Sequence, residues 1–444
     1  MNEALTTVIL LVLCFGWRWF TSWQLVQRCL HICGPLAGLF QWYTILFIGL
    51  GSLLIRTFYD IVVFEYLKYD FLNAGEFIDE PDFIPGLSPE EHAALHISPW
   101  LRIFALGAPV AGVLAGVVIT QHVSALVMAG VRRKKMAGDR LPWKASDQEN
   151  IVLLVIAMPL VFILMAVRAE IRSLAVMTGS AWLPYHGQDP PAKSWEEVKS
   201  LELATYTTDL EVANFFQYVT IFAFGRLCVY YLQDAPTEYR KALKLAGLQG
   251  VYLYVFFGAF RAIGNLAIAL LGENEKESRK AAAAAVLRDK VMTQVGPVFT
   301  VATLLCVYNM LILGSMSDIK KHLGSANLKF QGVRALVLIS QIQIQVLMGL
   351  CVGSPLYQAA EKLPAKYQDE IHSWHFSPYR AQLMHASLLC YECLLVVLFN
   401  RCVWSSKTDY MKVAQARELS EDGSDVDVDQ KLPALQQRLL VEKV

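Results

Sequence analysis

The stretch that decides the fold is Ile151 to Val167, which reads Ile-Val-Leu-Leu-Val-Ile-Ala-Met-Pro-Leu-Val-Phe-Ile-Leu-Met-Ala-Val. It contains no charged residue, and the apolar block continues to Gly179. A helix needs about 20 residues, at about 1.5 Å each, to cross the ~30 Å hydrocarbon core of a bilayer. Barrel strands would be about half as long and would alternate polar with apolar residues. The block therefore predicts a membrane-spanning α-helix.

The whole chain shares this composition. Of its 444 residues, 55% are hydrophobic and only 18% are charged, which is more apolar than a soluble core requires. We therefore expect an all-α polytopic membrane bundle whose main partner is the lipid bilayer, with no nucleic-acid partner. Seven blocks predict its core helices: Ile103 to Val131, Ile151 to Gly179, Val212 to Leu232, Val251 to Gly272, Val295 to Met316, Val333 to Gly353 and Leu383 to Trp404.

Two further apolar blocks, Ala4 to Phe20 and Ile32 to Ile55, precede the core and predict one or two extra spans. The first could instead be a signal peptide, but it lacks a positively charged start and a small-residue cleavage site, which favours an uncleaved segment. The predicted organisation has four parts: N-terminal hydrophobic spans (1–67), an acidic outer loop (68–100), the seven-helix core (101–404) and an acidic cytoplasmic tail (405–444). The composition of the tail predicts disorder.

The distribution of charge between the blocks predicts their orientation, because Lys and Arg are retained on the cytoplasmic side. The segments Arg132 to Arg140, Arg240 to Lys244 and Lys320 to Lys329 are basic, so we place them in the cytoplasm. The segments Asp70 to Glu91 and Gln188 to Asp209 are acidic, so we place them outside. This alternation of basic and acidic segments places the C-terminus in the cytoplasm. We expect a multi-pass protein of the plasma membrane or an endomembrane.

The chain carries few signals of catalysis or of metal binding. Cys390 and Cys393 share a helical face at i, i+3, but no His or carboxylate set completes a tetrahedral zinc site. There is no Gly-Lys-Ser/Thr phosphate loop, no Gly-x-Ser-x-Gly elbow and no His-Glu-x-x-His motif. We therefore expect no enzyme activity, no metal and no cofactor.

The functional candidates are ionisable and amide residues inside the apolar blocks. Such residues are costly in hydrocarbon and tend to face a bundle interior or a water-filled path. The alternative for any single one is a structural contact between helices. Gln341 and Gln345 are one turn apart and share a face, whereas Gln343 points away from it. The residues predicted to line a solute path are Arg226, Arg261, Asn309, Gln341, Gln345 and Glu392.

Two of these residues, Arg261 and Glu392, lie roughly ten residues from the nearer end of their blocks, too deep for a carboxylate to reach the headgroups easily. We predict that they form an ion pair. The rival hypothesis is that a protonated Glu392 bonds to Gln341 or Asn309 and leaves Arg261 to meet an anionic group of the substrate.

From about Leu101 to Tyr410 the chain resembles the family of organic solute transporter alpha and transmembrane protein 184. The similar features are a basic segment after the first core helix, Ile156-Ala-Met-Pro159, Ala259-Phe-Arg261 and Leu389-Cys-Tyr-Glu392-Cys. The most specific is the run Asn327-Leu-Lys-Phe-Gln-Gly-Val-Arg334 that leads to Ile339-Ser-Gln341. The resemblance implies a seven-helix bundle with an outside N-terminus.

The resemblance also implies transport of amphipathic organic solutes, in one branch with a small single-span partner subunit. A homo-oligomer is the alternative assembly. Our leading hypothesis is facilitated transport of an amphipathic, anionic organic solute, with Arg226 and Arg261 supplying positive charge inside the bundle. The alternatives are a seven-helix receptor or signalling protein, and a non-transporting scaffold whose tail recruits trafficking partners.

Overall fold

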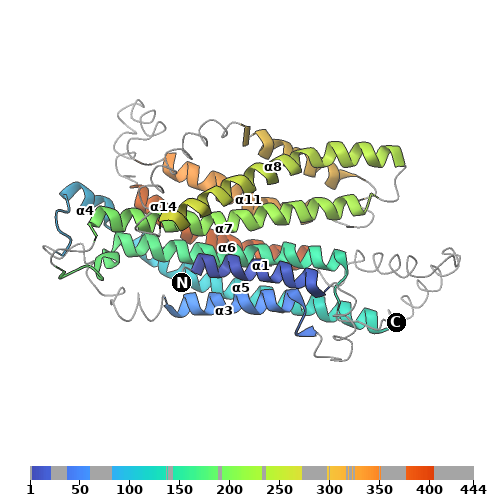
Figure 1. The fold of residues 1–444 in the computed structure, drawn as a ribbon, viewed down its shortest axis with the longest axis horizontal. Coiled ribbons are helices and arrows are strands. Elements are labelled where there is room, and N and C mark those ends of the chain that lie inside the picture. Colours follow the sequence, from blue (N-terminus) through green and yellow to red (C-terminus); the bar gives the residue numbers. More distant parts are fainter. Residues whose placement is uncertain are drawn as a thin grey trace.

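A computed structural model describes residues 3–21, 38–60, 83–136, 144–188, 193–232, 237–272, 301–316, 326–349 and 377–404, with a few isolated positions between these ranges. Every element in this part of the chain is helical. The long helices run roughly side by side along the longest axis of the molecule (Figure 1). They are α1 (Glu3–Thr21), α3 (Trp42–Asp60), α5 (Pro99–Met136), α6 (Asp147–Met177), α7 (Trp195–Tyr230), α8 (Thr237–Gly272), α11 (Ala326–Gly349) and α14 (Pro378–Val403), together with the short α4 (Pro89–Leu95) and η4 (Ser180–Trp182).

Polar residues fix the starts of the two central helices, α6 and α7. The hydroxyls of Ser146 and Ser194 accept hydrogen bonds from the backbone N–H groups of Glu149 and Glu197. Each glutamate side chain accepts from the serine N–H in return, which completes a capping box. After α6, Gly179 has a φ of 78°, a left-handed conformation that glycine adopts without steric cost.

Helix α6 is the centre of the bundle. Every residue from Val152 to Glu170 is buried, whereas the other long helices each keep an exposed face. Helices α7, α14, α5 and α3 pack against α6, while α8 packs on α7 and α11 packs on α14 (Figure 1). The most apolar stretch of the sequence is therefore the one that is surrounded by other helices.

The outer surface of the bundle is also apolar. Ile55 on α3, Ile103 and Leu114 on α5, and Phe256 and Phe260 on α8 are all more than half exposed. Large apolar side chains in such numbers on an outer face indicate contact with lipid. In the part of the chain that the structure describes, five helices are long and apolar enough to cross a membrane, namely α3, α5, α6, α7 and α14. These are the features of a multi-pass integral membrane protein.

The seven-span core is confirmed only in part. Helices α5, α6, α7 and α14 correspond to four of the seven predicted spans, and α3 corresponds to the second N-terminal block. Helices α8, α11 and Val301–Ser315 lie in the other three blocks, and their crossing of the membrane stays a prediction. The tail, 405–444, lies outside the described residues.

The predicted separation of charge along the bundle is present. Arg133 and Lys135 lie in the last turn of α5, which continues as helix to Met136 instead of opening into a loop. At the opposite end of the bundle, Glu91 of α4 forms an ion pair with Lys199 of α7. The basic and acidic segments therefore lie at opposite ends, and the side that faces the cytoplasm stays a prediction.

The predicted start of the third core helix is wrong. Helix α7 begins at Trp195, well before Val212, so most of the predicted outer loop between Gln188 and Asp209 is helical. The capping box at Ser194 starts the helix, and no proline interrupts it before its end. Hydropathy detects only the apolar part of such a helix, which places its start too late.

Candidate functional site

A cavity of about 200 Å³ lies inside the bundle between α6, α7, α8, α11 and α14. One side of its wall is apolar and includes Phe162, Leu210, Ile344, Met348 and Leu389. We call this space the central cavity. The polar side chains that line it are Tyr206, Thr207, Glu211, Asn214, Arg261, Gln382 and His385.

The charge in the central cavity comes from an ion pair between α7 and α8. The Arg261 Nη2 and Nε atoms donate to the same oxygen, Oε1 of Glu211, at 2.7 and 3.1 Å. The Glu211 side chain is 5% exposed and that of Arg261 is 32% exposed, so the arginine is the more accessible partner. The guanidinium also lies 5.8 Å from the centre of the Phe299 ring.

The predicted pair between Arg261 and Glu392 is wrong. Arg261 bonds to Glu211 instead, and Glu392 Oε1 accepts a hydrogen bond of 2.9 Å from the Gln343 amide of α11. The oxygen of the same amide lies 2.8 Å from Nδ1 of His385. Glu211 lies just before the apolar block that starts at Val212, in a part of the helix that hydropathy does not detect.

Of the other predicted path residues, Arg226 and Asn309 do not line the central cavity. Arg226 is exposed on the outer face of α7, one turn before the helix ends at Tyr230. From that position its long side chain can reach the headgroups, so it needs no polar interior. Asn309 is half-buried and does not line the central cavity. Gln341 and Gln345 lie on α11, but their side chains fall outside the described residues.

A layer of buried polar contacts joins α6 to α7 and α14 beside the central cavity. The Arg168 Nε donates to Asp209 Oδ1 at 3.2 Å, and these side chains are 3% and 0% exposed. The Ser387 hydroxyl donates to Glu170 Oε1 at 2.9 Å. The capping box at Ser194 could have revealed Asp209, because it predicts that the helix starts before the apolar block. This layer fixes the helices that form the wall.

A second cavity, of about 190 Å³, lies between α1, α7 and α8. Its walls are almost entirely apolar and include Leu11, Phe15, Phe215 and Ile263. Glu211 lines both cavities, so the apolar space adjoins the central cavity at the ion pair. Together the two spaces offer one cation, amide groups and an apolar wall, a combination suited to an amphipathic organic molecule.

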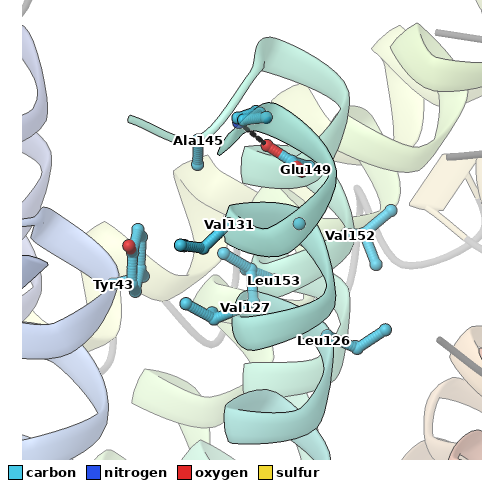
Figure 2. Close-up of a pocket in the computed structure, with 10 residues that line it drawn as sticks. Tyr43, Leu126, Val127, Val131, Ala145, Glu149, Val152 and Leu153 are labelled. Carbon is cyan, nitrogen blue, oxygen red and sulfur yellow. Dashed lines mark hydrogen bonds and ion pairs between the residues drawn. The ribbon is translucent and has the colours of Figure 1, made fainter. Parts of the chain in front are cut away.

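A third, narrower space lies at the basic end of the bundle, between α3, α5 and α6. Figure 2 shows Tyr43 facing Val127 and Val131 across it, with Glu149 at its upper rim. The Lys134 ammonium bonds to the Glu149 carboxylate and to the backbone carbonyl of Lys144. Since Glu149 also caps α6, this pair has a structural role in joining α5 to the start of α6.

No protein-family model matches the chain, and neither a curated protein nor a solved structure shows significant similarity to it. The geometry of the central cavity is therefore the main guide to the function of this chain.

Proposed function

We propose that this protein carries an amphipathic organic anion across the membrane by facilitated transport through the central cavity. The observation that supports the proposal most strongly is the position of Arg261, a partly exposed cation that lines a cavity of about 200 Å³ inside a membrane bundle. Ionisable residues at such positions are typical of substrate pathways. The resemblance to organic solute transporter alpha implies the same class of function.

The hydrogen-bonding capacity of Arg261 leaves room for a solute. A guanidinium has five N–H donors, and only its Nε and Nη2 atoms bond to Glu211. The Nη1 atom can bind an anionic group of the solute, and this group can also compete with Glu211 for the whole fork. The apolar wall and the adjoining apolar cavity then contact the hydrocarbon part of the molecule. Competition from Glu211 would limit the affinity for the solute and so favour its release, which transport requires.

Uptake into sealed vesicles that contain the purified full-length protein tests the proposal. We expect saturable uptake of a labelled fatty anion, and a loss of roughly tenfold or more in Arg261→Gln, because a charge-assisted hydrogen bond contributes about 1.5 to 3 kcal/mol. Arg226→Gln is the matched control, since Arg226 lies on the outer face of α7. Equal loss in both variants would contradict the assignment of the path.

The same preparation separates the alternative functions. Specific binding of the fatty anion without uptake would favour a receptor, and the absence of both binding and uptake would favour a trafficking scaffold. Either result would refute transport as proposed.

A further inference from the structure

A hydrogen-bonded chain connects the wall of the central cavity to a carboxyl group deeper in α14. His385 and Glu392 are seven positions apart on α14 and share a face, with Gln343 of α11 between them. The Gln343 Nε2 lies 2.9 Å from Glu392 Oε1, and the Gln343 Oε1 lies 2.8 Å from His385 Nδ1. His385 is 2% exposed and lines the central cavity.

We infer that Glu392 determines, through Gln343, whether His385 offers the central cavity a hydrogen-bond acceptor or a donor. An ionised carboxylate can only accept, so it orients the Gln343 NH₂ group toward Glu392. The amide oxygen must then face His385, and it too can only accept. The His385 proton is therefore on Nδ1. This leaves Nε2 as an acceptor toward the cavity.

Protonation of Glu392 reverses every bond in this chain. The Glu392 Oε2 atom is buried and has no hydrogen-bond partner among the described residues, so a proton on it would be stranded. A proton on Oε1 can be donated to the Gln343 oxygen once the amide turns over. The NH₂ group then donates to His385 Nδ1, which loses its own proton to water while Nε2 gains one. Glu392 takes up one proton, and the neutral imidazole keeps one.

The consequence for a solute, which rests on the proposed function, is a pH-dependent affinity. With Glu392 protonated, the Nε2–H of His385 can donate to an anionic group that Arg261 also binds. One added hydrogen bond strengthens binding by roughly fivefold. A solute that lacks acceptors gains nothing from the change. Glu392 thereby acts as a specificity-determining residue without contacting the solute.

The neighbouring ionisable groups are held by their own partners. Arg261 and Glu211 bond to each other, and Glu170 accepts from Ser387. From α5, the backbone carbonyl of Phe104 accepts from the Tyr391 hydroxyl. In the described residues, the titratable groups that face the chain from α6, α7, α8 and α14 are Glu170, Tyr206, Glu211, Arg261, Cys390, Tyr391 and Cys393.

Nitrogen-15 NMR of the histidine rings in the full-length protein, from about pH 4 to 9, tests the inference directly. A His385→Gln variant assigns the signal. We expect the neutral ring to carry its proton on Nδ1 at high pH and on Nε2 at lower pH, before it becomes imidazolium. His122 is the internal control, because its Nε2 faces the Trp404 carbonyl at 2.9 Å and must remain the protonated nitrogen throughout.

Two variants identify the residues that cause the change. In Glu392→Gln the proton position on His385 should no longer depend on pH, and the same is expected in Gln343→Leu, where the connection is cut. A wild-type ring that passes from the Nδ1–H form directly to imidazolium would overturn the inference. A pH-dependent move of the proton between Nδ1 and Nε2 of the neutral ring that persists in either variant would also overturn it.

Uptake of an alkyl sulfate, whose charge is constant over this range, separates the inference from the proposed function. If the proton on His385 changes position but no uptake occurs, transport is wrong and the hydrogen-bond chain stands. If uptake occurs without that change, the chain is wrong and transport stands. With both correct, apparent affinity for the sulfate should rise roughly fivefold at the lower pH in the wild type and stay constant in Glu392→Gln.

Discussion

Replacing Asp209 with alanine should cost about 3 to 5 kcal/mol of folding free energy, because it would strand the Arg168 charge inside the bundle. The two side chains are 0% and 3% exposed and are joined at 3.2 Å. They belong to α7 and α6, whose packing surrounds them, so neither group can reach water by a local movement. Replacing both with leucine removes both charges together, and we expect that change to cost less than either single truncation.

The control for this experiment is the pair between Arg172 and Glu202, which joins the same two helices nearby. Its N–O distance is 3.1 Å, but its side chains are 35% and 19% exposed, so Glu202→Ala should cost only about 0 to 1 kcal/mol. Chemical unfolding in mixed micelles, followed by tryptophan fluorescence, measures each loss. Equal losses for Asp209→Ala and Glu202→Ala would refute the claim that burial makes the first pair critical.

Two further predictions concern topology and packing. Single cysteines placed at Lys135 and at Glu196 should be labelled from opposite sides of sealed vesicles, because these residues lie at opposite ends of the bundle, and labelling of both from one side would contradict the arrangement of α5 and α7. Gly250→Ala should destabilise the bundle by about 1 to 3 kcal/mol, because the new Cβ would come within 2.6 Å of the Leu305 backbone, which cannot move aside. Gly264→Ala is the control, because a Cβ at this position would meet open space. Equal thermal unfolding temperatures for the two variants would contradict this packing.

The sequence predicted the class of fold because membrane helices must satisfy all their backbone hydrogen bonds internally and cover them with apolar side chains. The block from Ile151 to Val167 is a span by length and composition, and it lies in the buried centre of the bundle. Helix starts were less predictable. The first turns of α7 lie outside its apolar block, so hydropathy does not detect them, although the capping box at Ser194 does.

The candidate site was predicted only in part. Arg261 does line the central cavity, and Glu392 does sit in a polar chain, but each has a partner different from the one expected. Pairing between helices depends on their rotation and their neighbours, and the order of blocks in a sequence does not determine either. Gln343 shows this clearly, since it is not one of the predicted path residues, yet it bonds to both His385 and Glu392.

The central claim is that a solute passes through the central cavity, and filling that cavity tests it most directly. Thr207 and Leu210 both line the space, and tryptophan at either position, or at both, should occupy it. Phe260→Trp is the control, because Phe260 is 59% exposed on the outer face of α8. We predict that the cavity variants fold but lose fatty-anion uptake by at least about tenfold, while Phe260→Trp transports normally. Wild-type uptake by a folded protein with both cavity positions replaced would contradict the account.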